Sequence, residues 1–230
     1  MITIHKADDR GTTELGWLES SHSFSFGDFF DPEKMGFRTL RVLNDDHVQP
    51  GKGFPTHGHR DMEIVSYVLK GALQHKDDAG NEGVISHGEV QKMSAGTGIR
   101  HSEWNHSETE PVHFLQIWII PRTQGVTPSY EHAPFDLDEA KQNWVLLAAQ
   151  AGGLVTVDQD IAMAATIVQS GQRRALEFDE GRAGYMFVAK GAVRFHGNEL
   201  HAGDAAQIED EASLEIEALF DSEVIVFDIA

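Results

Sequence analysis

Two short segments of the chain supply four side chains of the kind that bind metal ions. His57 and His59 form one pair, and His101 and Glu103 form the other. On an extended strand, residues i and i+2 point to the same face, so each pair could act as a two-pronged clamp. Two clamps facing each other across a small barrel would give a site of three imidazoles and one carboxylate. This donor set suits Fe, Mn, Ni, Cu or Zn, and it suits Ca or Mg poorly.

The surroundings of these pairs favour a metal site over a chance pattern. The chain has 13 histidines, so some His-x-His spacing could arise by chance. However, a glycine-rich segment, 51–55, precedes His57, and another, 93–100, precedes His101. A metal that prefers six ligands would keep about two positions open here for substrate or dioxygen. The pattern therefore predicts a catalytic metal centre.

The composition limits what else the protein could be. There is no Cys, which excludes disulfides, zinc–thiolate sites and cysteine nucleophiles. The net charge of −19, from 18 basic and 37 acidic residues, would repel a phosphate backbone, so we expect no nucleic-acid partner. The same acidity leaves open a protein partner with a basic surface. No apolar run approaches the ~20 residues of a membrane span, and the N-terminus lacks a signal-peptide core. We expect no membrane association and a cytoplasmic location.

The hydrophobic pattern predicts an all-β fold. Short runs rich in β-branched and aromatic residues are separated by Gly, Asn, Asp and Pro about every 8–12 residues. Only Asp136–Gln142, with its acidic start, is typical of a short helix. Regular short strands favour a sandwich or barrel, with jelly rolls among the candidates. The clearest strand candidates are Phe37–Leu43, Glu63–Lys70, Val112–Ile120, Ile161–Val168, Gly184–Ala189, Leu214–Leu219 and Glu223–Ile229.

A weak internal repeat indicates two copies of one β unit. Residues 68–73 (Val-Leu-Lys-Gly-Ala-Leu) are echoed by residues 188–193 (Val-Ala-Lys-Gly-Ala-Val). Further along, Ser-His-Gly-Glu at 86–89 is echoed by His-Ala-Gly-Asp at 201–204. Prolines interrupt the strand-rich pattern between residues 121 and 143, which is where we place the boundary.

The two halves are expected to differ in chemistry. We predict an N-terminal domain, residues 1–130, that carries the metal site, and a C-terminal domain, residues 131–230, that is metal-free. The second half has no His-x-His at the matching place, and its His196 and His201 are isolated. Isolated histidines are more often surface or core residues than ligands, so one half does the chemistry.

With these residues in view, the chain resembles the cupins, and within them the pirin family. Gly51, His57, His59, Glu63 and Gly71 are spaced as in the first cupin motif, and Gly88 to Asn105 is similar to the second. The second motif departs from the general pattern with Ser94 in place of proline and four residues between Gly96 and His101. Those departures are features of pirins. Further segments that resemble pirin signatures are 22–32 (His-Ser-Phe-Ser-Phe-Gly-Asp-Phe-Phe-Asp-Pro), 44–46 (Asn-Asp-Asp), 56–63 and 93–103.

The resemblance implies a bicupin, with two jelly-roll β-barrel domains in one chain and the metal site in the first. It also implies a quercetin 2,3-dioxygenase activity, in which a flavonol and O2 react at the metal and the ring opens with release of CO. Fe(II) is the ion that the resemblance favours, with Zn, Mn, Ni, Cu or Co as alternatives. Glu103 would accept the proton of the flavonol hydroxyl, because it sits beside the ion.

Two glutamates compete as the fourth ligand. In cupins generally the first-motif glutamate, here Glu63, is a ligand, whereas in pirins it is the residue two positions after the third histidine, here Glu103. Spacing alone leaves both open, since Glu63 is an even number of residues from His57 and His59 and would share their face on one continuous strand. The pirin resemblance favours Glu103, and Glu63 would then hydrogen-bond an imidazole N–H or point elsewhere.

Other readings of the sequence remain open. The chain could be a metal-containing regulatory protein that acts through a protein partner, or a cupin enzyme that catalyses another reaction. We expect His106 to be a solvated loop residue and His113 a hydrogen-bonded sheet residue. An aromatic cluster is expected to belong to the core, although it could line a pocket for a planar substrate; its members are Phe24, Phe26, Phe29 and Phe30.

Overall fold

The computed structural model describes residues 1–230 and consists almost entirely of β-strands. It has 22 strands, one 3₁₀ turn at Ala7–Asp9 and one short helix, α1 (Leu137–Ala140). The all-β prediction is confirmed, and α1 forms inside the segment for which a short helix was expected. Its N-cap, Asp136, accepts a hydrogen bond from the backbone N–H of Asp138, which starts the helix. No helix has the length and apolar character needed to cross a membrane.

The chain divides into two compact units. The N-terminal unit comprises residues 10–134 and 154–159, and the C-terminal unit comprises residues 1–9, 135–153 and 160–230. β1 (Ile2–His5) belongs to the C-terminal unit because it pairs with β20 (Ala205–Glu209). The sequence-based domain limits, 1–130 and 131–230, stay a prediction.

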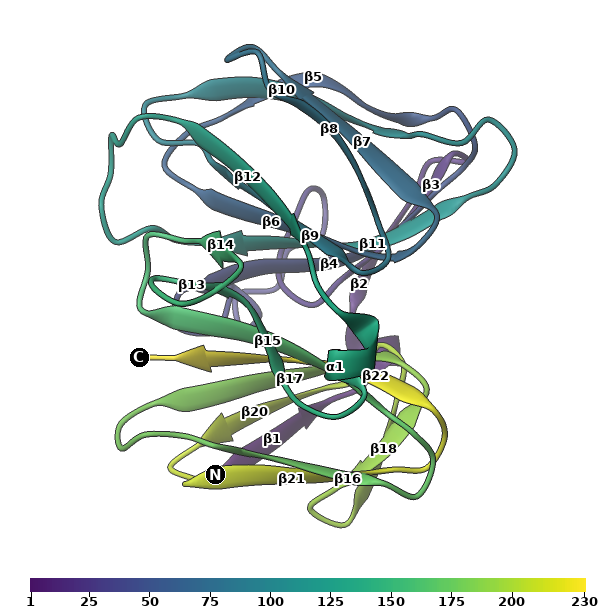
Figure 1. Ribbon diagram of the computed structural model, residues 1–230, viewed down its shortest axis with the longest axis vertical. Coiled ribbons are helices and arrows are strands. Elements are labelled where there is room, and N and C mark those ends of the chain that lie inside the picture. The colour runs from purple at the N-terminus through teal and green to yellow at the C-terminus, as the bar shows by residue number, and fades with distance from the viewer. The chain divides into compact units, whose positions relative to one another are not determined.

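Two antiparallel sheets form the N-terminal unit, and Figure 1 shows them as two layers. The larger sheet has the order β12-β9-β6-β11-β4-β3-β2, and the smaller has the order β5-β10-β7-β8. The larger sheet consists of β2 (Gly11–Glu14), β3 (Leu18–His22), β4 (Leu40–Val48), β6 (Glu63–Lys70), β9 (Glu89–Ser94), β11 (Val112–Ile119) and β12 (Ser129–Pro134). The smaller consists of β5 (Gly53–His59), β7 (Ala72–Asp77), β8 (Glu82–Ser86) and β10 (Ile99–Asn105). The unit also contains the two-residue strand β14 (Val155–Thr156).

An apolar cluster holds these two sheets together. It takes residues from four strands of the larger sheet and from β7 and β8 of the smaller one. Members on the same strand, such as Val112 and Phe114, are two residues apart and so point to the same face of the sheet. Burial of such side chains is worth about 1.5–3 kcal/mol each, so the cluster fixes the frame on which β5 and β10 are carried. Its buried members are Leu18, Val48, Val68, Leu73, Ile85, Val112 and Phe114.

The C-terminal unit repeats this topology. Its sheets have the orders β1-β20-β17-β22-β15-β13 and β16-β21-β18-β19. Setting β6 equivalent to β17 aligns the strand orders of the two units, with β5 equivalent to β16, β10 equivalent to β21, and the edge strand β2 left without a counterpart. The strands are β13 (Val145–Ala149), β15 (Ile161–Val168), β16 (Arg173–Glu177), β17 (Ala183–Lys190), β18 (Ala192–Phe195), β19 (Asn198–His201), β21 (Ser213–Ala218) and β22 (Ser222–Ile229).

The internal repeat in the sequence marks one hairpin that occurs in both units. Gly71 joins β6 to β7 with φ 79°, and Gly191 joins β17 to β18 with φ 77°. Neighbouring backbone also leaves no room for a side chain at either position. A Cβ added at Gly71 would lie 2.9 Å from the carbonyl oxygen of Pro111, and one added at Gly191 would lie 2.3 Å from the carbonyl oxygen of Asp221. Only glycine meets both requirements, which explains why the Lys-Gly-Ala sequence recurs.

Candidate metal centre

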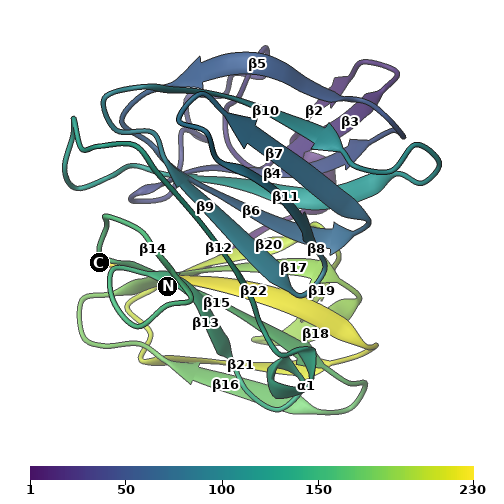
Figure 2. The same cartoon turned by 45° about the horizontal axis from the view of Figure 1, so that its top comes forward.

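The two predicted clamps lie on neighbouring strands of the smaller sheet. His57 and His59 end β5, and His101 and Glu103 lie in β10. The two strands run side by side in Figures 1 and 2, with His101 directly opposite His57 and Ile99 opposite His59. Two side chains from each strand are therefore brought to the same face.

A β-bulge in β5 adjusts this pairing at the site. His101 faces His57, but Glu103, two residues later, faces Phe54, so β5 carries an extra residue here. Pro55 lies in the bulge, where its missing N–H is tolerated. A Cβ at Gly53 would lie 2.2 Å from the Glu103 carbonyl oxygen, so β5 can approach β10 this closely only with glycine. The glycine-rich segment before His57 thus positions the backbone of Glu103.

The three histidine rings converge on one point. Nε2 of His57 lies 3.1 Å from Nε2 of His101. The ring centroids are 4.7 Å apart for His57 and His59, 4.5 Å for His57 and His101, and 4.8 Å for His59 and His101. One nitrogen from each ring lies within 4.8 Å of the others, which is close enough for one ion to touch all three.

Hydrogen bonds fix the orientation of two of the rings. Nδ1 of His57 lies 2.8 Å from the Pro55 carbonyl oxygen, to which it donates, so its Nε2 keeps a lone pair. Nδ1 of His101 lies 3.3 Å from Nδ1 of His75, and Nε2 of His75 lies 3.2 Å from Oδ2 of Asp77. If His75 donates to Asp77, its Nδ1 can accept from His101, which again leaves Nε2 of His101 with a lone pair.

The sequence analysis missed His75 and Asp77. Both lie in β7, which pairs with β10 and places Asp77 opposite His101 and His75 opposite Glu103. His75 is fully buried and stacks on Tyr130, with ring centroids 4.7 Å apart. The signal that could have found them is their own i, i+2 spacing, the same one that revealed the two clamps.

Burial and neighbouring imidazoles keep His59 and His101 neutral. Burial, together with the neighbouring His101 and His57, lowers the pKa of His59 to about 4. Burial and the adjacent imidazoles of His57 and His75 lower the pKa of His101 to about 3. Neutral imidazoles are the form that binds metals, so His59 and His101 can accept a cation at neutral pH.

Glu103 is buried beside the histidines and held at both oxygens. Its Oε1 accepts a hydrogen bond from Oγ of Ser66 at 3.2 Å, and its Oε2 accepts one from Nε2 of Gln116 at 2.6 Å. A carboxylate oxygen of Glu103 lies within 4.8 Å of ring nitrogens of His101 and His75. Both hydrogen-bond donors come from the larger sheet, which aims the carboxylate across the barrel.

Glu63 lies outside this cluster. Its carboxylate accepts a hydrogen bond from Oγ of Ser94 at 2.7 Å. Ser66, three residues further along β6, contacts Glu103, and residues three apart on a strand face opposite sides. Glu63 and His57 do not share a strand face, although they are an even number of residues apart. The turn at Arg60–Met62, in which Asp61 takes φ 47°, separates β5 from β6. Glu103 is the glutamate that the fold brings to the histidines.

A cavity of about 300 Å³ opens onto His57, His59 and Glu103. Apolar side chains form part of its wall, with Phe26 and Trp118 packed edge to face at a centroid distance of 5.4 Å. Polar side chains of β2, β3 and β4 form another part of the wall. They are Thr13, Ser20, His22, Asn44 and Asp46.

The polar wall is internally hydrogen-bonded. His22 contacts Asn44 Oδ1 through Nδ1 and Thr13 Oγ1 through Nε2, both at 2.8 Å. The Ser20 hydroxyl donates to Asp46. Burial raises the pKa of Asp46 to about 7, although the Ser20 hydrogen bond acts in the opposite direction. The cavity therefore holds two buried carboxyl groups, Glu103 and Asp46, on different strands.

The other residues singled out in the sequence have varied environments. His106 is exposed and His113 is a sheet residue bonded to Asp45 at 2.6 Å, as expected. His196 and His201 are both exposed. The aromatic cluster is split, because Phe24 is buried, Phe26 lines the cavity and Phe30 is exposed. The expectation that the whole cluster belongs to the core is therefore wrong for Phe30 and Phe26.

The comparison with family models decides the relationship. Residues 4–119 match the model described as Pirin, and residues 145–229 match the quercetinase C-terminal cupin domain. The chain belongs to the pirin family. The pirin and bicupin predictions are confirmed, and the all-β topology described above is that of two cupin units in one chain.

Similar pirins span the full length of this one. The chain is 44% identical over 229 residues to the quercetin 2,3-dioxygenase of Escherichia coli K12, covering 100% of this chain and 99% of that protein. It is 39% identical over 233 residues to the pirin-like protein of Caulobacter vibrioides, covering all of both. The crystal structure of bacterial pirin YhhW from E. coli in complex with nickel(II) superposes with a TM-score of 0.93 and 42% identity, covering 100% of this chain and 99% of that one.

Proposed function

We propose that this pirin is a metal-dependent quercetin 2,3-dioxygenase whose ion is bound by His57, His59, His101 and Glu103. The observation that carries the proposal is the convergence of the His57, His59 and His101 rings, with the buried Glu103 carboxylate close to His101, beside a cavity lined by His57, His59 and Glu103. The E. coli relative named quercetin 2,3-dioxygenase, at 44% identity over the full length, supports the substrate. The reaction would consume a flavonol and O2, open the ring and release CO.

The donor set fits a divalent transition ion. Three nitrogen ligands and one oxygen ligand suit Fe, Ni, Co, Cu, Mn or Zn. The hydrogen bonds at Nδ1 of His57 and Nδ1 of His101, to Pro55 and His75, leave the Nε2 lone pair of each ring available to the ion. Fe(II) is the ion that we propose from the family resemblance, and nickel(II) is the ion named for the E. coli structure. A bound ion would supply a Lewis acid that lowers the pKa of a coordinated hydroxyl.

Glu103 is proposed to accept the proton from the flavonol hydroxyl. A general base must lie within hydrogen-bond reach of that proton, and Glu103 lines the cavity beside His57 and His59. Hydrogen bonds from Ser66 and Gln116 hold both of its oxygens, so the carboxylate has little freedom to turn away. This arrangement is expected to keep the carboxylate in position throughout turnover.

The cavity walls are proposed to orient a flat polyphenol. A volume of about 300 Å³ is at the small end of the range for small-molecule sites, about 300–1,000 Å³. Phe26 and Trp118 offer aromatic surface to the rings. Asn44 and Asp46, on the polar wall, could bind substrate hydroxyl groups and exclude other orientations.

An assay that follows three quantities tests the function. Protein purified without a His-tag is analysed for its metals, then reconstituted with Fe(II) or nickel(II) and mixed with quercetin. We expect quercetin loss, O2 uptake and CO release in equal amounts. O2 uptake without CO would indicate another oxygenase reaction. A fully loaded protein that consumes neither quercetin nor O2 would contradict the proposal and favour the regulatory alternative.

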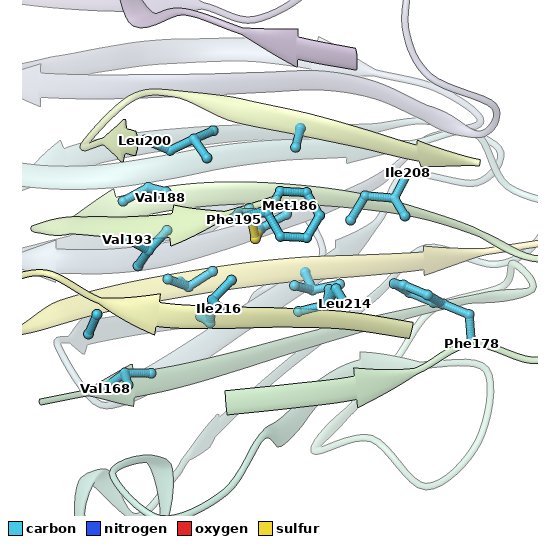
Figure 3. Packing of buried hydrophobic residues seen from close by; sticks show 14 residues of the cluster. Val168, Phe178, Met186, Val188, Val193, Phe195, Leu200, Ile208, Leu214 and Ile216 are labelled. Carbon is cyan, nitrogen blue, oxygen red and sulfur yellow. The ribbon is translucent and has the colours of Figure 1, made fainter. Parts of the chain in front are cut away.

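We further propose that the C-terminal unit is metal-free. Matching the hairpin glycines Gly71 and Gly191 makes His75 equivalent to Phe195. The strand partner of His75 is Glu103, whereas the partner of Phe195 is Ile216. Figure 3 labels Phe195, Leu214 and Ile216 in the packed apolar core of this unit. Apolar side chains thus fill the space in which the N-terminal unit has its ligands.

Anomalous X-ray scattering from crystals grown with nickel(II) can test this asymmetry. We expect a peak at the three histidines of the N-terminal unit and none in the C-terminal unit. The exposed His196 lies in the turn between β18 and β19, the exposed His201 ends β19, and neither belongs to a group of three ligand side chains that could chelate an ion. An ion coordinated by either histidine would contradict the prediction.

A further inference from the structure

A second group of metal-binding side chains lies on the larger sheet of the N-terminal unit. Asp45 and His47 are two residues apart in β4, and His113 lies directly opposite His47 in β11. One ligand atom from each residue lies within 4.8 Å of the others. An i, i+2 pair on one strand that faces a histidine on its neighbour is the same local construction that builds the site at His57 and His101.

The two imidazoles approach one carboxylate oxygen. Nε2 of His113 lies 2.6 Å from Oδ1 of Asp45, and Nε2 of His47 lies 3.9 Å from the same oxygen. Two ligands bound at 2.1 Å to a tetrahedral zinc ion lie about 3.4 Å apart. The observed distances lie on either side of this value, so an ion is admitted when the His113–Asp45 pair opens by about 0.8 Å and the His47–Asp45 pair closes by about 0.5 Å. The rings of His47 and His113 are stacked, with centroids 3.8 Å apart and planes at 17°.

This group is separate from the cavity described above. Asn44 and Asp46 in β4 line that cavity, and neither Asp45 nor His47 does. Successive residues of a strand point to opposite faces, so Asp45 and His47 point away from the cavity. No step of the proposed dioxygenase reaction uses them.

We propose that Asp45, His47 and His113 form a second, independent binding site for a divalent transition ion such as Zn²⁺. Two imidazoles with one carboxylate, and a further position open to water, form a ligand set used for zinc in proteins. The side chain of His47 is 48% exposed, so an ion can reach the site from solvent and keep a water ligand.

The surroundings orient the carboxylate and balance its charge. Nη1 of Arg10 lies 3.2 Å from Oδ2 of Asp45, which leaves Oδ1 directed at the two imidazoles. Outer hydrogen bonds of this kind orient carboxylate ligands. The positive charge of Arg10 opposes a cation, and Glu19, which pairs with His47 in β3, favours one. We therefore expect weaker binding here than at the site with three histidines and Glu103.

Zinc titration of the full chain, with bound metal counted after equilibrium dialysis, tests the second site. Wild type is expected to bind two Zn²⁺ per chain, His47→Gln one and His101→Ala one, with almost none retained when both substitutions are combined. Cobalt(II) substitution then shows by visible absorption whether the ion lost in His47→Gln is four-coordinate. His106→Gln, an exposed histidine outside both groups, is the matched control and should bind two ions.

The outcomes are distinct from those that test the proposed function. One Zn²⁺ in wild type and the same one in His47→Gln would overturn the second site. A second equivalent that survives both His47→Gln and His113→Gln would place the ion elsewhere and would also overturn it. His47 is half-exposed, so His47→Gln tests the site even if the more buried His113 variant folds poorly. Circular dichroism and thermal melting check the fold of each variant.

Discussion

Replacing His101 with alanine is expected to remove the metal of the N-terminal cavity and the quercetin-cleaving activity together. Of the proposed ligands, His101 has the most contacts within the cluster, since it lies 3.1 Å from Nε2 of His57 and 3.3 Å from Nδ1 of His75. It is also almost completely buried, so no other side chain can swing in from solvent to replace it. The loss in affinity should exceed the roughly 10–100-fold that follows removal of an outer hydrogen-bond partner.

Metal content and quercetin consumption measured on the same samples check this prediction. The two quantities should fall in proportion, so that activity per bound cavity ion changes little among the molecules that still hold one. His106→Ala is the matched control, because His106 is exposed and follows β10 directly. Wild-type metal content in His101→Ala, counted at the cavity by anomalous scattering, would show that His101 is not a ligand.

Asp77→Asn should give an intermediate result. Asp77 does not reach the ion in our proposal but accepts from His75, which in turn contacts His101. Its loss would loosen the orientation of His101 while leaving all four ligands in place. We expect affinity to fall by about 10–100-fold and activity at saturating metal to recover. A variant with unchanged affinity would show that the Asp77–His75 pair is only structural.

The candidate site could be proposed from the sequence because strand geometry is local. The spacing of His57 with His59 and of His101 with Glu103 needs only the two-residue period of a strand to give two clamps. The glycine-rich segment before His57 also carried information, since Gly53 makes the close approach to β10 possible. The sequence analysis placed the two clamps facing each other across a small barrel, whereas the structure places them on adjacent strands of one sheet, with His101 opposite His57.

The missed features depend on pairing between distant strands. His75 joins the cluster because β7 pairs with β10, and a single sequence does not reveal which strands pair. Spacing alone also left Glu63 and Glu103 both open as the fourth ligand, and the pirin resemblance favoured Glu103. The parity argument for Glu63 assumed one continuous strand, whereas the turn at residues 60–62 changes the direction of the chain.

The boundaries of the two units also depend on pairing between strands that are distant in the sequence. The repeated hairpins at Gly71 and Gly191 revealed two similar units, because a left-handed glycine in a tight turn leaves a clear sequence signal. The pairing of β1 with β20, however, joins residues at opposite ends of the chain. The short run Ile2–His5 carries no mark of that partner, so its membership of the C-terminal unit could not be predicted.

Replacing Glu103 with glutamine is expected to lower quercetin turnover per bound metal ion by about 10²–10⁴-fold, the usual contribution of a positioned general base. The amide should fit, because its oxygen can accept from Gln116 while its nitrogen donates to Ser66, whose hydroxyl can in turn donate to the Gln116 oxygen 3.3 Å away. Three imidazoles remain, so metal binding should weaken without being lost. The variant thus separates the carboxylate's role as a base from its role as a ligand.

The measurement is quercetin consumption divided by cavity metal, for wild type, Glu103→Gln and Glu63→Gln. Glu63 is the matched control, since it is an equally buried glutamate of the same unit whose partner is Ser94. We expect Glu63→Gln to keep wild-type turnover per ion. If Glu103→Gln does so as well, Glu103 is not the base, and Asp46 becomes the candidate. It is the other buried carboxyl group of the cavity, and burial already raises its pKa to about 7, where a carboxylate is a stronger base than at its ordinary value.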